Sequence, residues 1–463
     1  MNVRRCQSPL AISFRSSTAS PRPVLTSYPV SRLSGFVRAP GDKSCSHRAL
    51  IFGGLAEGTT KITGLLEGDD VLRTGDAMAA LGADVRQDAS GEWTVTGVGS
   101  KGLTSPEGDL DFGNSGTGSR LMLGVMAGYD LEARIIGDTS LSARPMGRVM
   151  DPLSKMGAMF DAADGDRLPL TLKGSSKLAA MEYTPPHASA QIKSAVLLAG
   201  LNAVGTTILR EPRMTRDHTE RMLQGFGATL QIRLDGGNRV VSIEGGQTLS
   251  GGNDLRVPGD PSSAAFLVAA GVISPGGDVT IEDVMSNETR DGFFRMAQRM
   301  GGVLGAESTG DAAGERLINL AASRSELKGI TVPESVVPSM IDEFPILAVV
   351  AAFAEGETRV TGASELRVKE TDRIAAVVDM LRVNGVDVED DEDGFVVQGC
   401  GGPPPGGGTV ETRHDHRIAM SALVMGTSAQ NPVTVDDASM IATSYPDFVE
   451  HLNGLGADIR DDT

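Results

Sequence analysis

A short pattern recurs six times along the chain and restricts the folds that it can adopt. Each copy is a helix-like segment that ends in an apolar residue, a glycine and a small residue, as in MAALGADV at 78–85 and LNGLGADI at 452–459. Each glycine predicts a helix C′ residue in the left-handed conformation, directly before a strand. The glycines lie 70 to 84 residues apart: Gly82, Gly157, Gly227, Gly301, Gly385 and Gly456.

A second pattern repeats in step with the first. A short alternating strand precedes a helical segment in every copy, as in TTKITGLLEG at 59–68 and NPVTVDDASM at 431–440. The period is too long for the thin layers of a solenoid, so each copy predicts a βαβ-type unit. Because 463 residues exceed one compact core, we expect an α/β protein with two domains of three units each.

Two similar turns mark the places where the chain passes between these domains. VRAPGDKSCSHRAL at 37–50 and LRVPGDPSSAAFLV at 255–268 share a Pro-Gly-Asp turn between a strand and a helix. We therefore expect one domain of residues 33–41 plus 258–463, another of residues 42–257, and a cleft between them. The tail of residues 1–32 is rich in Ser, Arg and Pro and is expected to be disordered.

Composition excludes several classes of function. The formal net charge is −18 and no apolar run could cross a bilayer, so neither a nucleic acid nor a membrane is an expected partner. Cys6, Cys45 and Cys400 have no metal-ligand spacing, and no cofactor-binding fingerprint appears, so we expect no metal and no cofactor. These features favour a cytoplasmic protein over one with an organelle transit peptide.

Cations concentrate in short segments where a loop meets a helix. Alone, any of them is most simply a solvated surface charge, but helix N-termini also favour phosphate and carboxylate groups. Asp342, directly before the apolar run FPILAVVAAF, and Glu370 in VKETDR are acid or base candidates, although each could equally be a helix cap. The cations are Lys43, Arg48, Arg120, Arg144, Arg148, Arg216, Lys369, Arg373 and Arg417.

Taken together, the motifs resemble those of the 5-enolpyruvylshikimate-3-phosphate synthase family, and most closely its bacterial class II form. The resemblance runs from about residue 33 to the C-terminus and implies a two-domain inside-out α/β barrel of six βαβαββ units. It rests on PGDKSCSHRAL, GNSGTGSRLM, SARPMGR, SAQIKSAVLLAGL, MTRDHTERML, PSMIDEFPILAV, RVKETDRIAA and DHRIAMSALV.

The resemblance also implies a reaction and its residues. A transferase of this family moves the enolpyruvyl group of phosphoenolpyruvate to the 5-hydroxyl of shikimate 3-phosphate, within aromatic amino acid biosynthesis, by addition and then elimination of phosphate. The implied shikimate 3-phosphate ligands are Lys43, Ser44, Arg48, Ser189, Ala190, Gln191, Arg216, Asp342 and Lys369. The implied phosphoenolpyruvate ligands are Lys43, Gly116, Arg144, Gln191, Arg373 and Arg417.

Three residues are implied in catalysis, and the sequence leaves the division of labour among them open. Asp342 is the expected proton acceptor for the hydroxyl and Glu370 the partner at the methylene carbon, with Lys43 beside them. Glyphosate is the expected inhibitor, because Gly116 leaves room at the phosphoenolpyruvate site. One departure is Ser444, where many relatives have a Lys. Because the substrates would lie between two domains joined by two crossovers, we expect the lobes to close on shikimate 3-phosphate. We also expect the protein to be a monomer.

Two other functions are considered. UDP-N-acetylglucosamine enolpyruvyl transferase shares the fold and the donor, but it typically carries a reactive cysteine where this chain reads GDTSLSARP. A non-catalytic phosphate-binding protein could keep the same fold. The retention of Lys43, Asp342, Glu370 and the arginines argues against that second alternative.

Overall fold

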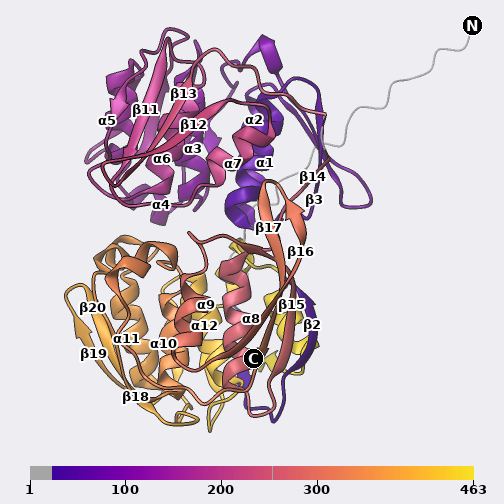
Figure 1. Cartoon of the computed structure of the whole chain (residues 1–463), viewed down its shortest axis with the longest axis vertical. Helices are drawn as coiled ribbons and strands as arrows, with labels where there is room; N and C mark the ends of the chain where they lie inside the picture. The colour runs from indigo at the N-terminus through magenta and orange to yellow at the C-terminus, as the bar shows by residue number, and fades with distance from the viewer. Residues whose placement is uncertain (1–22, 253, 463) are drawn as a thin grey trace, which may run out of the picture.

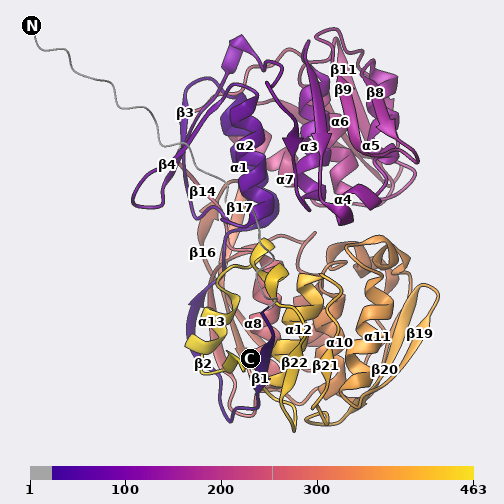
Figure 2. The ribbon, with the colours of Figure 1, turned by 180° about the vertical axis from the view of Figure 1, so that it is seen from behind.

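The computed structural model describes residues 23–252 and 254–462 and shows two lobes, one above the other in Figure 1. The upper lobe of that view runs from α1 (Lys43–Leu55) to β14 (Asp254–Arg256), and the lower lobe holds the rest of the described chain. Figure 2 shows the same division from behind. None of the helices within the described residues is long and apolar enough to span a membrane.

The described residues form six sheets, one for each unit predicted from the sequence. In the upper lobe each sheet has a parallel strand at one edge, then the unit's first strand, and then a hairpin whose second strand lies in the middle. The upper sheets, with strands in spatial order, are β14, β3 (Thr59–Thr63), β5 (Trp93–Thr96), β4 (Asp84–Gln87); β6 (Leu110–Asp111), β7 (Glu132–Ile136), β9 (Arg167–Lys173), β8 (Met159–Ala163); and β10 (Glu182–Tyr183), β11 (Thr206–Glu211), β13 (Asn238–Glu244), β12 (Leu230–Asp235).

The lower lobe repeats this arrangement with two variations. In one sheet two parallel bridges, Lys328 to Glu355 and Thr331 to Arg359, take the place of the parallel strand. In another the middle strand comes from the N-terminal end of the described chain. The lower sheets are β2 (Ser34–Arg38), β15 (Asp278–Ser286), β17 (Glu315–Ser323), β16 (Val303–Ala312); β18 (Glu355–Val360), β20 (Gly394–Cys400), β19 (Asp387–Asp391); and β21 (Thr409–Val410), β22 (Val433–Val435), β1 (Leu25–Tyr28), β23 (Asp458–Asp461).

Strand β1 corrects the prediction of a disordered tail through residue 32. It pairs antiparallel with both β22 and β23, and Ser27 in it is fully buried. The sixth unit has no third strand of its own after β23, so β1 occupies the position that β9 holds in the second unit. The remainder of the predicted tail, residues 1–22, lies outside the described residues.

Helices occupy the centre of each lobe and the sheets cover them, which is the inside-out arrangement. The six inner helices are buried along most of their length, and all thirteen residues of α8 are buried. The inner helices are α1, α3 (Gly116–Ala127), α6 (Ala190–Gly200), α8 (Pro261–Ile273), α10 (Phe344–Phe353) and α12 (His416–Gly426). The other helices are α2 (Asp69–Ala80), α4 (Thr139–Ala143), α5 (Gly147–Met156), α7 (His218–Gly225), α9 (Gly292–Arg299), α11 (Arg373–Val383), α13 (Phe448–Gly454), and the 3-10 segments η1 (Gly99–Lys101), η2 (Glu334–Ser339), η3 (Ser364–Val368) and η4 (Ser439–Thr443).

The glycine of each repeat has the predicted conformation. All six have positive φ, between 76° and 117°, and each lies between a helix and the next strand. An L residue with a side chain rarely adopts this conformation, which explains why the pattern keeps glycine there. The prediction of six left-handed helix ends is confirmed.

The two Pro-Gly-Asp turns lie side by side where the chain passes between the lobes. Gly41 and Gly259 form an antiparallel bridge, Asp42 N donates to Pro258 O at 2.7 Å, and Asp260 N donates to Pro40 O at 2.8 Å. A Cβ on Gly41 would lie 2.0 Å from Gly64 O, so this turn needs a glycine at that position. Together the two strands of chain form a double hinge between the lobes.

Candidate active site

A cleft of about 760 Å³ lies between the lobes, and residues at the starts of five inner helices line it, together with Asp342, two residues before the sixth. In the upper lobe these include Lys43, Gly116 and Ser189; in the lower lobe they include Ser262 and Arg417. The first N–H groups of a helix have no partner within the helix and carry its positive dipole end. Five such ends around one cleft make it a site for anions.

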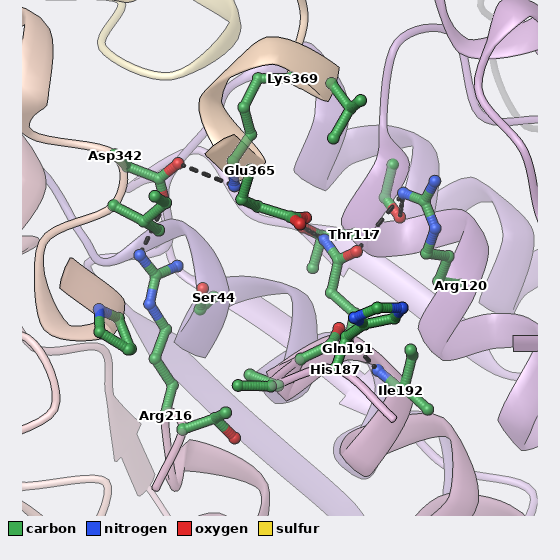
Figure 3. Close-up of a pocket in the computed structure, with 18 of the residues that line it drawn as sticks. Ser44, Thr117, Arg120, His187, Gln191, Ile192, Arg216, Asp342, Glu365 and Lys369 are labelled. Carbon is green, nitrogen blue, oxygen red and sulfur yellow. Dashed lines mark hydrogen bonds and ion pairs between the residues drawn. The ribbon is translucent and has the colours of Figure 1, made fainter. Parts of the chain in front are cut away.

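Asp342 is the central carboxylate of the lower side of the cleft. It lies two residues before α10 and is surrounded by cations: Arg216 Nη2 lies 2.6 Å from Oδ2, and Lys369 Nζ lies 3.4 Å from Oδ1. Figure 3 shows Arg216 reaching it from below and Lys369 from the right. Burial alone would raise the pKa of Asp342, but these cations, with Arg417 and Arg373, outweigh it and hold that pKa well below its usual range. The Asp342 carboxylate is therefore ionised at neutral pH.

Glu370 is a second ionised carboxylate in the same wall. Its Oε2 lies 2.5 Å from Arg373 Nη2, and burial, which would raise its pKa, is outweighed first by Arg373 and then by Arg144 and Lys369. The imidazole of His416 is buried beside it, and burial together with Arg417 holds the pKa of His416 well below its usual value. At neutral pH the Glu370 carboxylate is therefore ionised and the His416 ring is neutral.

Lys43 is the first residue of α1 and forms an ion pair with Asp70 at the start of α2. The Lys43 side chain is 22 % exposed, whereas that of Asp70 is almost fully buried. Asp70 Oδ1 has no hydrogen-bond partner within the described residues. A buried carboxylate thus holds the Lys43 ammonium at the edge of the cleft.

On the upper-lobe side of the cleft, a crowded group of arginines lies near Gly116. Arg144 Nη2 donates to Asn114 Oδ1 at 2.6 Å, and Arg120 Nη1 donates to Gly116 O at 3.1 Å. Burial, together with Arg144 and Arg148, lowers the pKa of Arg120 to about 10. Cations packed closely enough to depress an arginine pKa are typical of a binding site for a multiply charged anion.

A serine–alanine–glutamine start brings α6 to the same place. Ser189 Oγ accepts from Ile192 N at 3.4 Å as the helix cap, and Gln191 Nε2 donates to Thr117 Oγ1 at 3.0 Å. Figure 3 shows Gln191 between Thr117 and His187, with Arg120 beyond them. Ser44 of α1 lines the same cleft, so the starts of α1, α3 and α6 face one space.

Most of the predicted site residues meet in this cleft, but two do not line it. Arg48 is buried inside the upper lobe, where Nε donates to Thr219 Oγ1 at 2.7 Å and Nη2 to Ser194 Oγ at 2.8 Å. Arg373 is 1 % exposed and lies behind Glu370, with its Nε donating to Asp415 Oδ2 at 2.8 Å. Ser444, the departure noted above, does not line the cleft either. The residues that do line it are Lys43, Ser44, Gly116, Arg144, Ser189, Ala190, Gln191, Arg216, Asp342, Lys369, Glu370 and Arg417.

The cleft also contains residues that sequence reasoning left without a role. Arg148 Nη1 lies 3.6 Å from Glu365 Oε2 and joins the rims of the two lobes. Ser262 and Arg290 line the floor beside the hinge. Arg120 and Arg148 were visible as loop-to-helix cations, whereas Arg290 follows SNET and has no glycine, serine or proline directly beside it.

The thiols of the described chain lie away from this chemistry. Cys45 is fully buried, and burial raises the pKa of its thiol well above the usual value. Cys400 is exposed on β20 and does not line the cleft. The loop and short helix before Arg144 contain no cysteine. A nucleophilic cysteine of the kind expected in UDP-N-acetylglucosamine enolpyruvyl transferase is thus missing from that loop.

Comparison with known proteins identifies the family. Residues 27–452 match the model of the family described as EPSP synthase (3-phosphoshikimate 1-carboxyvinyltransferase). The chain belongs to this family. A 3-phosphoshikimate 1-carboxyvinyltransferase of Hyphomonas neptunium is 68 % identical over 438 residues, which cover 94 % of this chain and all of that one. A protein of the same name from Mesorhizobium japonicum is 54 % identical over 92 % of this chain and 96 % of its own length.

Solved structures agree with this assignment. The EPSP synthase of Acinetobacter baumannii superposes with a TM-score of 0.83 at 41 % identity, covering 95 % of this chain and all of that one. The enolpyruvyl transferase NikO of Streptomyces tendae has a TM-score of 0.72 at 21 % identity over 95 % of this chain and 99 % of its own, which shows the shared fold. The predicted family and its inside-out two-domain fold are confirmed.

Proposed function

We propose that this chain transfers the enolpyruvyl group of phosphoenolpyruvate to the 5-hydroxyl of shikimate 3-phosphate and releases phosphate. The observation that carries this proposal is the meeting of five helix starts and a ring of cations around the ionised carboxylates Asp342 and Glu370. Both proposed substrates are anions, and both need a site that neutralises charge before any proton can move. The named relatives support the same reaction.

Shikimate 3-phosphate is proposed to bind first, mainly to the upper lobe. Its phosphate would lie at the start of α6, near Ser189 and Ala190, with Arg216 turning from Asp342 toward it. Ser44 and Gln191 would contact the ring, and Lys369 the hydroxyl groups. Arg48 would act from behind, because its Nη1 donates to Ser44 O at 2.8 Å and fixes the first turn of α1.

Phosphoenolpyruvate is proposed to bind between the lobes. Lys43, Arg144 and the N–H groups near Gly116 and Gln191 would contact it from above, and Arg417 from below. Arg373 would act through Glu370 and Asp342. Its Nη2 lies 2.5 Å from Glu370 Oε2, and its Nη1 lies 3.2 Å from Asp342 Oδ1.

The charges of the cleft suggest how the acid and base roles arise. When the Arg216 and Lys369 side chains turn to substrate oxygens, the pKa of Asp342 rises, because the groups that lowered it are now neutralised. Asp342 can then accept the hydroxyl proton as the oxygen attacks C2 of phosphoenolpyruvate. The negative charge of phosphoenolpyruvate likewise raises the pKa of Glu370, which fits it to exchange a proton at the methylene carbon, with the Lys43 ammonium beside it.

The assembly and setting of the enzyme follow from the same proposal. The enzyme is proposed to act as a monomer in the cytoplasm. The lobes are proposed to close on shikimate 3-phosphate, and glyphosate is proposed to inhibit by occupying the phosphoenolpyruvate site.

A coupled phosphate-release assay tests the function. We expect phosphate release with phosphoenolpyruvate and shikimate 3-phosphate, and none when UDP-N-acetylglucosamine replaces the second substrate. Release with the nucleotide sugar alone would assign the chain to the other transferase. Binding of both ligands by calorimetry without turnover would instead support a phosphate-binding protein.

A further inference from the structure

A single buried arginine joins the two Pro-Gly-Asp turns of the hinge. Arg290, in the segment between β15 and α9, is 3 % exposed, and its guanidinium lies between Asp42 and Asp260. Nη1 donates to Asp42 Oδ2 at 2.7 Å, and Nη2 donates to Asp260 Oδ1 at 2.8 Å. The two carboxylates belong to the matching turns that begin α1 and α8, although 218 positions separate them in the sequence.

Each of these aspartates also caps its own helix. Asp42 Oδ1 accepts from Cys45 N at 2.7 Å, and Asp260 Oδ1 accepts from Ser262 N at 2.8 Å. The same carboxylates therefore fix the first turn of a helix and the arginine between the helices. Because a guanidinium is planar and presents its donors in a rigid fork, it sets the distance and angle between its two partners.

A histidine and a glutamate from different lobes hold the arginine in place. His218 Nε2 lies 3.1 Å from Arg290 Nη1, and His218 Nδ1 lies 2.9 Å from Glu315 Oε1. An arginine can only donate, so Nε2 accepts and the ring proton is on Nδ1, which donates to Glu315. Burial accordingly lowers the pKa of His218, and the ring is neutral. Glu315 begins β17, and the β16–β17 hairpin extends from the lower lobe toward α1 and α7 (Figure 1).

The arginine also connects the hinge with the cleft. Arg290 Nη2 donates to Ser262 Oγ at 3.0 Å, and Ser262 donates in turn to Glu343, which lies 3.7 Å from Arg417. On the other side, Asp42 directly precedes Lys43. The buried cluster of Asp42, His218, Asp260, Arg290 and Glu315 (the hinge cluster) thus lies between residues proposed to contact phosphoenolpyruvate from the two lobes.

We propose that Arg290 is a positioning residue for the reaction. By bonding to both cap aspartates it fixes the starts of α1 and α8 relative to each other. Lys43 on α1, and Arg417, which is reached from α8 through Ser262 and Glu343, are thereby held in the arrangement that phosphoenolpyruvate needs. This role rests on the function proposed above. Shikimate 3-phosphate takes most of its proposed contacts from the upper lobe and depends on the hinge much less. Loss of Arg290 should therefore impair the use of phosphoenolpyruvate much more than the binding of shikimate 3-phosphate.

The test compares Arg290→Gln and Arg290→Lys with the control Arg295→Gln, whose arginine is half exposed and pairs with Asp291 and Ser339 on the lower lobe. For Arg290→Gln we expect kcat/KM for phosphoenolpyruvate to fall about 100-fold and the dissociation constant of shikimate 3-phosphate to change less than about threefold. Arg290→Lys should recover part of the loss, because it keeps the charge but not the fork. The control should match the wild type.

A purely structural role predicts a different result: fewer active molecules, hence a lower kcat with both KM values unchanged, and that outcome would overturn the proposal. Small-angle scattering of the unliganded proteins adds a readout that needs no turnover. We expect a broader distance distribution for Arg290→Gln than for the wild type, even if the wild type proves inactive with these substrates. Identical curves would count against the clamp itself. If Arg290→Gln does not fold, Arg290→Lys and Asp42→Asn carry the same comparison.

Discussion

In the upper lobe, α3 and α6 begin with neutral serine caps, Ser115 and Ser189, whereas all three inner helices of the lower lobe begin with a carboxylate. Those carboxylates, Asp260, Glu343 and Asp415, each lie near an arginine. The first helical residues differ in the same way. They are Lys43, Gly116 and Ala190 in the upper lobe, and Pro261, Phe344 and His416 in the lower lobe.

This difference assigns separate electrostatic roles to the two lobes. A serine cap uses one N–H and adds no charge, so the positive end of the helix remains available to an external anion. An acidic cap neutralises the end of its own helix, and the positive charge then comes from the arginine beside it. The starts of α3 and α6 should therefore bind anions with backbone and small side chains, whereas the lower lobe uses Arg417 and Lys369. The start of α1 follows the lower-lobe pattern, because Asp42 caps it and Lys43 supplies the positive charge. Four predictions test this comparison.

The largest effect is expected at Lys43, which is the first residue of α1, whereas α8 begins with Pro261. Lys43→Ala removes the ammonium at the edge of the cleft, so kcat should fall about 10²- to 10⁴-fold, the range typical of a lost proton-transfer group. The phosphate-release assay measures it. Lys61→Ala is the matched control, because Lys61 is exposed on β3 and pairs with Glu92 at the surface. If both variants kept wild-type turnover, the start of α1 would have no special role.

A second effect is expected at Gly116, where α3 starts without a side chain. An added Cβ would lie 2.8 Å from Arg120 Nη1 and 3.2 Å from Arg144 Nη1, so both guanidinium groups must move. In Gly116→Ala we expect the glyphosate inhibition constant to rise about tenfold or more, which corresponds to about 1.4 kcal/mol. The KM for phosphoenolpyruvate should rise less.

The control for that experiment is Gly454→Ala at the end of α13, where an added Cβ meets nothing within 4 Å. Inhibition of this variant should equal that of the wild type. An unchanged inhibition constant in Gly116→Ala itself would show that the inhibitor does not approach this part of α3.

The sequence predicted the parts of this comparison that depend on local pattern. Repeated glycines gave the six units, and caps followed by apolar runs gave the helix starts, because both are set by neighbouring residues. The sequence did not show that Arg48 and Arg373 lie behind the cleft wall. Their loop-to-helix position resembles that of Arg144, and only tertiary packing against Ser194 or Asp415 separates them from it.

Long-range pairing explains the remaining differences. Strand β1 has the composition of a polar tail and becomes a strand only because β22 and β23 offer it two edges. Arg290 stands between acidic residues in a stretch typical of a surface loop, and its partners Asp42 and Asp260 come from other segments. The sequence shows that the Pro-Gly-Asp turn is repeated, but it does not show that Arg290 lies between the two turns.

A third prediction compares the two hinge aspartates, which share one arginine but titrate differently. Burial alone would raise the pKa of Asp42, but the charge of Arg290 and the hydrogen bond from Cys45 N outweigh it and hold that pKa below its usual range. Burial and the nearby Asp42 raise the pKa of Asp260 to about 6. The native state therefore favours an ionised Asp42 and binds a proton at Asp260 more tightly than the unfolded chain does.

The sign of each effect on stability follows from these shifts. The contribution of Asp42 is complete above pH 4 and is lost only as the pH falls below that value. The contribution of Asp260 is present at low pH and is lost as the pH rises from about 4 through about 6. Between pH 7.5 and pH 5 the destabilisation caused by Asp260→Asn should thus grow by about 1 kcal/mol, while that caused by Asp42→Asn stays constant. Urea unfolding at the two pH values measures both, and equal slopes would show that the carboxylates are equivalent.

The smallest effect is expected at Pro261, which stands at the first position of α8 where α1 has Lys43. A proline there has the backbone angle that the helix needs and restricts the unfolded chain, so Pro261→Ala should cost about 0.5 to 1 kcal/mol of stability. Turnover should remain within about twofold of the wild type, because Pro261 does not line the cleft and supplies no reacting group. Alanine at the first residue of α1 would then remove activity, whereas alanine at the first residue of α8 would lower stability alone. A tenfold loss of turnover in Pro261→Ala would instead give the second crossover a part in the chemistry.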